Sequence, residues 1–386
     1  MSAQVQSPAV GAGTADVRDA PLARALASPR IRGLDFMRAV AVLLVLADHS
    51  GLYRLGPLAF FDGGFGVEIF FVLSGFLITK LLCDEVDRNG SISFRAFYWR
   101  RAARLLPAFY LYLLGGAAML VLMHRELPWG AIATASFYTI NYYQAFTGAE
   151  PHYLSHCWSL AVEEQFYLLW PLLLAFVLRK RLGLIRALAV AIVLLWLLRL
   201  LYVVLGASDE YLYRALETRA DQLAVGCLLA ALVRDARWRA RIEAFVGMGW
   251  IVPAAILVAI LFSLTLHGTL FGKYAIAYSL EPVLVALMIP VAIVSANGLG
   301  FGARMLNDPV AVMIGRVSYG VYLFHPWVIH PIRHLIERAT GLTYVSILIS
   351  IVVLIGVAYV SFVCFETPIQ RAMLGKRPRG ASKVAS

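Results

Sequence analysis

An arginine and a histidine, Arg38 and His49, stand eleven residues apart in the hydrophobic stretch "RAVAVLLVLADHS". In a helix, eleven steps of about 100° return His49 to within about 20° of the Arg38 face, about 16 Å further along the axis. One stripe of one helix would then join a permanent cation to an imidazole, a side chain often used as a general base. Alternatively, His49 is a packing residue with its hydrogen bonds satisfied. Asp48 points about 100° away from His49, so we do not expect it to orient the imidazole from the same helix.

Three carboxylates are expected near the depth of His49. Glu68 lies in the next hydrophobic segment, and the adjacent pair Glu163 and Glu164 lies in "WSLAVEEQFYLLWP". An acid inside a hydrophobic helix is costly and needs a partner or a cavity. Because Glu163 and Glu164 face directions about 100° apart, we expect one of the two to reach the same cavity as His49.

A block of arginines, Arg100, Arg101 and Arg104 in "FYWRRAARLLP", is expected at the depth of Arg38. Such a block commonly anchors a helix on the cytoplasmic side of a membrane. Arginine is also the side chain that holds phosphate groups bidentately, so these residues are candidates for a phosphate site. Ser74 and Gly75 in "VLSGF" are small and serve either helix packing or the close approach of a ligand.

Further polar residues are expected toward the outer side. Arg219 and Asp221 in "ETRADQLAVG" are candidates for an ion pair or for a grip on a substrate. His325 precedes Pro326 near an expected helix end, where a capping or structural role, a catalytic role and substrate binding are all open.

These segments belong to a chain for which lipid is the main solvent. The 386 residues are 61% hydrophobic and 15% charged, with a mean hydropathy of +0.76, whereas soluble domains carry about 25% charge. The net charge of +11 would suit nucleic acid, but in a membrane protein the placement of Lys and Arg matters more, and we expect no nucleic-acid partner. The four cysteines show no ligand spacing, so we expect no metal.

The hydrophobic segments predict an all-α polytopic membrane protein with about ten transmembrane helices. An eleventh segment, 128–147, is aromatic and polar, and we expect it to be interfacial or re-entrant. With ten crossings, most Lys and Arg residues and both termini lie on the cytoplasmic side, as the positive-inside rule requires. We expect a disordered cytoplasmic tail over 1–30 and a basic cytoplasmic tail over 369–386. The ten predicted spans are 34–54, 61–82, 97–123, 156–178, 184–206, 217–233, 247–266, 274–295, 309–330 and 343–365.

At these residues the sequence resembles a known family. It is similar, block by block and in order, to the acyltransferase 3 family, integral membrane O-acyltransferases that modify bacterial surface glycans and some macrolides. The resemblance covers about residues 31–368. Its blocks are "RGLDFMRAVAVLLVLADH", "GVEIFFVLSGFLIT", "FYWRRAARLLP", "WSLAVEEQFYLLWP", "RADQLAVG" and "SYGVYLFHPW".

The resemblance implies transfer of an acyl group, commonly acetyl, from cytoplasmic acyl-CoA to a hydroxyl of a surface glycan, a glycan precursor or a macrolide. It implies an enzyme of the bacterial cytoplasmic (inner) membrane. His49 corresponds to the essential histidine, and a carboxylate among Glu68, Glu163 and Glu164 would fix its tautomer. Asp48 stands where an uncharged residue is usual, and it would alter the basicity of His49 or help to bind the acceptor. The expected CoA-binding residues are Arg38, Ser74, Gly75, Arg100, Arg101 and Arg104.

Three questions stay open from sequence alone. Direct transfer with His49 as general base competes with an acyl-histidine intermediate. A polytopic transporter of an anionic or acylated substrate is the alternative function, although the two halves show no repeat of the kind common in transporters. A membrane scaffold with buried ion pairs is the third possibility, and it leaves the shared depth of His49 and the carboxylates unexplained.

Overall fold

In the computed structural model, the described residues are 21–28, 30–52, 63–151 and 153–375. All regular structure in these ranges is helical, which confirms the all-α prediction. Residues 53–54 and 61–62 of two predicted spans, most of the predicted N-terminal tail and the end of the C-terminal tail lie outside the described residues.

Each of the ten predicted spans coincides with a helix. Seven of the described helices are long and apolar enough to cross a membrane. The other three are α2, which has 16 residues, and α10 and α15, which carry more polar side chains. The structure therefore has the character of a membrane protein, and the count of ten crossings stays a prediction. The ten helices are α2 (Leu34–His49), α3 (Gly63–Asn89), α4 (Phe94–Leu122), α7 (Cys157–Arg179), α8 (Leu184–Val204), α10 (Leu216–Arg234), α12 (Ile251–Thr265), α13 (Tyr278–Asn297), α15 (Pro309–Thr340) and α16 (Thr343–Ser361).

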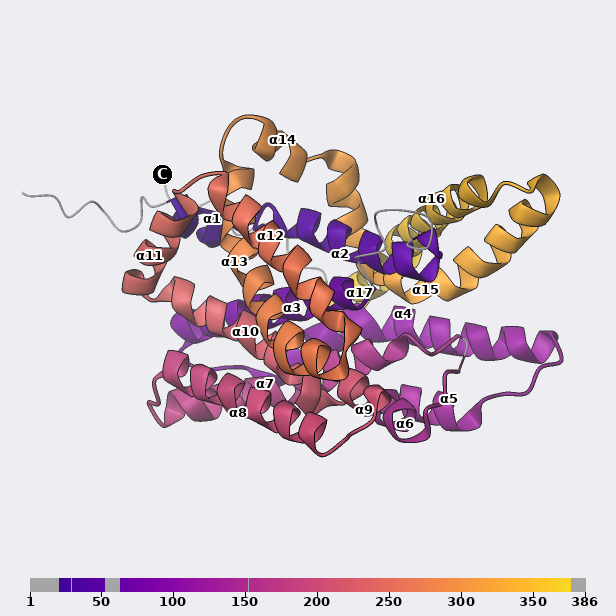
Figure 1. Cartoon of the computed structure of the whole chain (residues 1–386), viewed down its shortest axis with the longest axis horizontal. Coiled ribbons are helices and arrows are strands. Elements are labelled where there is room, and N and C mark those ends of the chain that lie inside the picture. The colour runs from indigo at the N-terminus through magenta and orange to yellow at the C-terminus, as the bar shows by residue number, and fades with distance from the viewer. Residues whose placement is uncertain (1–20, 29, 53–62, 152, 376–386) are drawn as a thin grey trace, which may run out of the picture.

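The doubtful segment 128–147 forms two short helices, α5 (Trp129–Ser136) and α6 (Ile140–Thr147). Eight residues span about 12 Å, less than half of the hydrocarbon core of a bilayer. As predicted, the segment therefore does not cross the membrane as a single helix. In Figure 1, α5 and α6 lie toward the end of the molecule opposite α1 and α11.

The remaining helices are short and lie between the long helices or near the chain termini. Two helices have an aspartate as N-cap. Asp235 accepts hydrogen bonds from two N–H groups at the start of α11, and Asp308 does the same for α15, where Pro309 takes the first helical position. These elements are α1 (Pro21–Ala27), α9 (Asp209–Arg214), α11 (Ala236–Val246), α14 (Phe301–Leu306), α17 (Thr367–Leu374), the 3-10 turn η3 (Leu266–Gly268) and the π-helical segments η4 (Gly272–Ala277) and η5 (Phe362–Glu366).

Helix α1 corrects the expected extent of disorder in segment 1–30. Its Leu22 and Ala25 are buried, and the Leu22 N–H donates to Glu243 Oε1 of α11 at 3.1 Å. Burial of these apolar residues gives the helix tertiary support, which an isolated seven-residue helix lacks. The first six residues of segment 369–386 likewise belong to α17.

Helix α3 is the central element, and it packs along α2 and α10. Glycines allow the close approach of α3 to α10. A Cβ atom on Gly75 would lie 1.9 Å from the Leu223 carbonyl oxygen, and one on Gly226 would lie 2.1 Å from that of Val72. Gly75 thus serves the packing of α3 against α10, one of the two roles considered from sequence.

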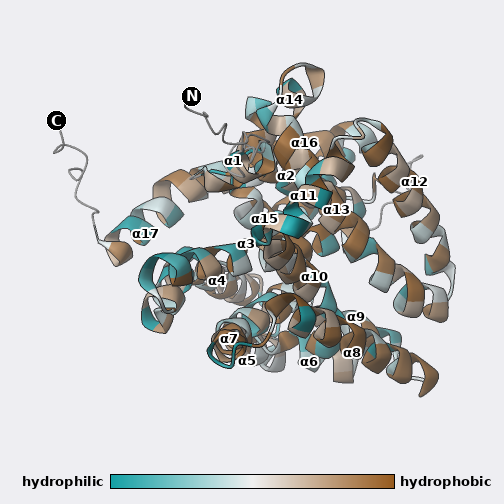
Figure 2. Ribbon diagram, turned by 90° about the vertical axis from the view of Figure 1, so that its left-hand side faces the viewer, coloured by the Kyte–Doolittle hydropathy of each residue, from teal (hydrophilic) through white to brown (hydrophobic). Residues whose placement is uncertain are grey.

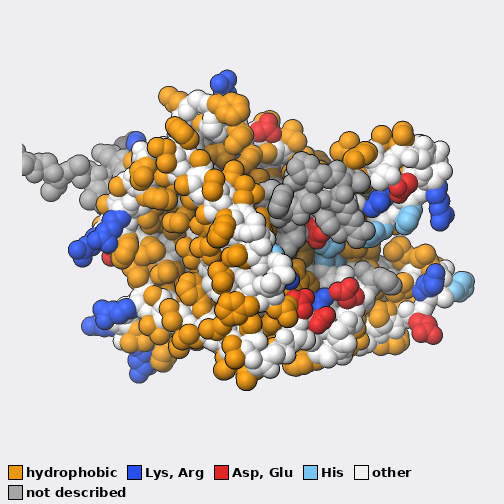
Figure 3. All heavy atoms as spheres, in the orientation of Figure 1, with side chains coloured by type: hydrophobic (Ala, Val, Ile, Leu, Met, Phe, Trp, Pro, Cys, Tyr) orange, Lys and Arg blue, Asp and Glu red, His pale blue; other side chains and the backbone are white. Residues whose placement is uncertain are grey.

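The molecular surface is divided as expected for a chain in a bilayer. Outer helices such as α8 and α12 are strongly hydrophobic (Figure 2). In Figure 3, Lys and Arg side chains gather at the left end and again toward the right, and the surface between them is largely hydrophobic. A broad apolar surface flanked by charge is what lipid contact requires.

Candidate active site

Five helices, α2, α3, α4, α7 and α15, meet around a cavity of about 100 Å³. It brings together side chains that the sequence analysis grouped from separate segments, and it adds others. The predicted residues on its wall are Arg38, Ser74, Arg101, Arg104 and Glu163; the polar side chains that the sequence analysis gave no role are Ser159, Tyr167, Arg316, Ser318, Tyr319 and Tyr322.

Four arginines dominate the electrostatics of this cavity. Arg101 and Arg104 are three residues apart on α4 and therefore share a face. The Arg101 guanidinium lies 3.5 Å from the centre of the Tyr167 ring, and its buried Nε has no hydrogen-bond partner among the described residues. Arg104 and Arg316 are exposed, so the cavity opens to the surface on their side. With Arg38, this arrangement suits a ligand carrying several negative charges.

Glu163 is the member of the acidic pair that reaches the cavity. Its Oε1 accepts hydrogen bonds from the Ser74 hydroxyl of α3 and, at 2.7 Å, from the Tyr167 hydroxyl. Glu164 is not among the residues that line the cavity, which agrees with the predicted separation of about 100°. The hydrogen bonds of Glu163 do not include His49, so in the described structure this carboxylate fixes the cavity wall and does not hold the imidazole.

The tautomer of His49 is set by the backbone. His49 Nδ1 lies 3.0 Å from the Val45 carbonyl oxygen, one turn earlier on α2. Because a carbonyl oxygen only accepts, Nδ1 carries the hydrogen and Nε2 is left with a free lone pair. The Asp48 carboxylate lies 3.9 Å from the same Nδ1. At this distance the carboxylate acts on the imidazole through its charge, whereas the Val45 carbonyl orients the ring.

His49 lies outside the cavity lining; His325 packs against it, and a third histidine, His156, packs against His325. The His325 ring lies 4.5 Å from the His49 ring and 4.8 Å from the His156 ring, between centroids. His325 lies within α15 and is 1% exposed, so it does not cap a helix end. Tyr322, on the cavity wall, donates a hydrogen bond to the His156 carbonyl oxygen at 2.9 Å. The three rings, which we call the histidine cluster, therefore lie directly behind one wall of the cavity.

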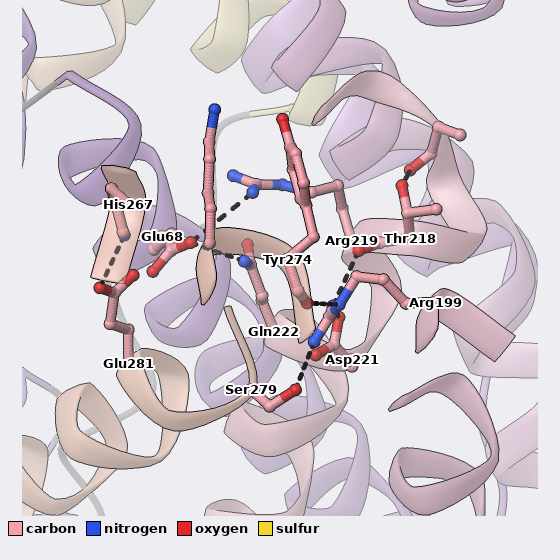
Figure 4. A network of polar contacts seen from close by, with 12 residues as sticks. Glu68, Arg199, Thr218, Arg219, Asp221, Gln222, His267, Tyr274, Ser279 and Glu281 are labelled. Atoms are coloured by element: carbon pink, nitrogen blue, oxygen red, sulfur yellow. Dashed lines mark hydrogen bonds and ion pairs between the residues drawn. The ribbon is translucent and has the colours of Figure 1, made fainter. Parts of the chain in front are cut away.

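Other predicted residues belong to a separate buried network (Figure 4). Glu68 accepts a hydrogen bond from Gln222 at 2.8 Å and forms an ion pair with Arg219 at 3.6 Å. Asp221 pairs with Arg199 of α8 at 2.7 Å. The expected Arg219–Asp221 ion pair is not formed, because residues two apart on a helix do not face each other. Glu68 accordingly does not orient His49.

Arg100 also lies outside the cavity. It forms an ion pair with Glu85 of α3 at 3.1 Å, and its side chain is 51% exposed. It directly precedes Arg101 in the chain, and the resulting rotation of about 100° about the helix axis takes it off the cavity face. Its position matches the anchoring role considered from sequence.

Three residues of the cavity wall and the histidine cluster were not predicted from the sequence: Arg316, Tyr167 and His156. Arg316 could have been found as a lone cation in a predicted span, which needs a partner or a cavity. His156 begins the predicted span 156–178, at the depth predicted for His49. The shared depth of the two histidines could therefore have identified it. Tyr167 follows Glu163 by four residues, the helical spacing at which side chains meet.

The comparisons with known proteins concern nearly the whole chain. Residues 31–366 match the family described as an acyltransferase domain. The peptidoglycan O-acetyltransferase OatA of Listeria monocytogenes is 30% identical over 366 residues, covering 88% of this chain and 56% of OatA. The Bacillus subtilis protein YrhL, provisionally named a peptidoglycan O-acetyltransferase, is 29% identical over 374 residues, covering 88% of this chain and 55% of YrhL.

A provisionally named O-acetyltransferase of Staphylococcus aureus is 31% identical over 362 residues, covering 88% of this chain and 57% of that protein. The chain thus spans little more than half the length of these relatives. No solved structure matches. The match over residues 31–366 shows that this chain belongs to the acyltransferase 3 family.

Proposed function

We propose that this chain is a membrane O-acyltransferase that moves an acetyl group from acetyl-CoA to a hydroxyl of a glycan. The observation that carries the proposal is the cavity with four arginines on its wall, next to the histidine cluster. Phosphate groups suit such a cluster, because guanidinium groups bind them through paired, charge-assisted hydrogen bonds. A donor with phosphates at one end and a thioester at the other has the chemistry to join these two regions.

In this proposal the phosphates of CoA bind Arg38, Arg101, Arg104 and Arg316. Exposed Arg104 and Arg316 mark the side from which the donor enters, and Ser74 and Glu163 line its route further in. Under the ten-crossing topology, with both termini cytoplasmic, this entrance faces the cytoplasm of a bacterial cell and the enzyme lies in the inner membrane. Gly75 and Arg100 take no part.

His49 acts as general base in the proposed reaction. Its Nε2 lone pair takes the proton of the acceptor hydroxyl, and the hydroxyl oxygen forms a bond to the thioester carbonyl carbon. The carbon–sulfur bond breaks, and the departing thiolate takes the proton from the His49 imidazolium, giving free CoA thiol. The Val45 carbonyl holds Nδ1–H throughout, and Asp48 stabilises the imidazolium by its charge. We propose this direct route, in which the acetyl group passes to the acceptor without an acyl-histidine intermediate.

The acceptor is proposed to be a cell-surface sugar polymer, with peptidoglycan the first candidate. This proposal is supported by the names of OatA and YrhL. The relatives are longer than this chain, so the acceptor has to be tested on this protein directly.

The test uses the purified full chain in detergent with radiolabelled acetyl-CoA and a soluble trimer of N-acetylglucosamine. Labelled trisaccharide and free thiol should form together, and His49→Ala should reduce both by about 10²–10⁴-fold, the usual contribution of a general base. Loss of label from acetyl-CoA into a stable acyl-enzyme would instead support the acyl-histidine route. A wild-type protein that binds acetyl-CoA, moves it across a vesicle membrane and never cleaves it would be a transporter.

A further inference from the structure

We propose that His325 is a positioning residue for His49: a neutral imidazole that fixes the plane of the His49 ring and stabilises the imidazolium formed there. The inference rests on the proposed function only in giving His49 the role of base. It assigns His325 no contact with the acceptor, in contrast to the substrate-binding role considered from sequence.

The hydrogen bonds of His325 define its protonation state. Its Nδ1 lies 2.5 Å from the Tyr322 carbonyl oxygen, which can only accept, so Nδ1 carries the hydrogen. Its Nε2 then holds a lone pair, and this nitrogen is buried without a hydrogen-bond partner among the described residues. Native structures leave few buried polar atoms unpaired, and one beside a reacting group needs an explanation.

The positive charge that the histidine cluster can hold is limited. His325 and His156 are 1% and 4% exposed, whereas the His49 side chain is 36% exposed. Burial disfavours an imidazolium, and three rings in sequence at 4.5 and 4.8 Å cannot all take protons because like charges repel. Since His49 takes the proton in the proposed reaction, His325 is the neutral neighbour that stays beside it.

The orientation of the His325 ring relative to the His49 ring also supports the proposal. His49 and His325 meet edge to face, with 75° between their planes. Such a contact fixes the rotation of an aromatic side chain. It also places a neutral aromatic ring 4.5 Å, between centroids, from the imidazolium that forms when His49 gains its second N–H. Asp48 lies near the Nδ1 side of His49, so the imidazolium has a carboxylate and a neutral imidazole as neighbours.

His325 is itself held in place by hydrogen bonds through Tyr322. Tyr322 accepts the His325 Nδ1–H through its carbonyl and donates through its hydroxyl to the His156 carbonyl. Ser159 lies 2.6 Å from the same hydroxyl. Because Tyr322 and Ser159 both line the arginine cavity, the wall that faces the donor also sets the position of the ring that faces His49.

Three substitutions separate the properties of His325. His325→Phe keeps a ring but removes both nitrogens, and His325→Asn keeps a donor for the Tyr322 carbonyl while removing the ring and Nε2. His325→Gln places an amide near the position of Nε2. His334→Phe is the control, because His334 lies on the same helix and is exposed.

The kinetic experiment uses the purified full chain in detergent, acetyl-CoA and the N-acetylglucosamine trimer. We expect kcat to fall at least tenfold in His325→Phe and His325→Asn, with the KM for acetyl-CoA within twofold of wild type. His325→Gln should recover part of the lost kcat, and His334→Phe should match wild type. A His325→Phe variant with wild-type kcat, or a loss equal in all three variants and accompanied by a raised KM, would overturn the inference.

A second measurement does not depend on activity. In the full chain labelled with [¹⁵N]histidine, the His325 signals, assigned by their loss in His325→Gln, should show one protonated and one unprotonated nitrogen with the hydrogen on Nδ1. A hydrogen on Nε2, or two protonated nitrogens, would refute the proposal. A wild-type protein that transfers no acetyl group would count against the proposed function alone, since the spectrum still decides the state of His325.

Discussion

Arg104 offers the sharpest test of the arginine cavity, because a matched control stands four residues away on the same helix. Replacing Arg104 by alanine should weaken CoA binding, whereas replacing Arg100 should not. Both side chains are exposed, and both substitutions remove one positive charge from the same end of α4. Arg104 lines the cavity, and Arg100 is paired with Glu85 outside it. A difference between the variants therefore reports direct contact, independent of the general positive field.

The expected magnitude follows from the hydrogen bonds at stake. A hydrogen bond to a charged group contributes about 1.5–3 kcal/mol, and about 1.4 kcal/mol corresponds to a tenfold change in Kd. Since Arg104 is exposed, water screens part of this contribution, and we expect Kd for CoA to rise about tenfold. Arg101 is held over the Tyr167 ring with an unpartnered Nε, so its replacement should cost nearer the upper end, about a hundredfold.

The measurement is titration calorimetry of CoA into each purified variant, with the thermal unfolding midpoint recorded to establish that the protein is folded. Equal Kd values for Arg104→Ala, Arg100→Ala and wild type would refute the assignment of the cavity to the CoA phosphates. Equal weakening in the two variants would show that only the overall charge of this end of α4 attracts CoA.

Two further predictions concern stability. Gly75→Ala should lower the unfolding midpoint, because the added Cβ would lie 1.9 Å from the Leu223 carbonyl and overpacking commonly costs about 1–3 kcal/mol; Gly356→Ala, where nothing lies within 4 Å, is the control, and equal midpoints would contradict the packing role. Asp221→Asn should destabilise by about 3–5 kcal/mol, since it leaves the buried Arg199 charge without its partner. Asp87→Asn, at an exposed pair with Arg234, should change stability by less than about 1 kcal/mol, and similar losses in the two variants would show that Asp221 has no special role.

Much of the cavity was predictable because its members follow helical spacing within single segments. Arg101 and Arg104 share a face, and Ser74 and Glu163 line the cavity from the helices on which they were predicted. The contribution of α15 was not predictable in the same way, since Arg316 is brought to Arg38 only by packing of distant segments. Partner choice in the buried network also depended on tertiary contacts: Arg199, which pairs with Asp221, lies within a long apolar run.

The error over Glu68 has a simple geometric origin in α3. Glu68 and Gly75 are seven residues apart, two helical turns, and both face α10, where they meet Gln222 and Leu223. Ser74 precedes Gly75 by one residue, so it is rotated by about 100° and faces the cavity. Depth in the membrane grouped Glu68 with His49, whereas rotation about the helix axis separates them. For a central helix that is buried on several sides, depth therefore selects candidates, and rotation decides which of them share a site.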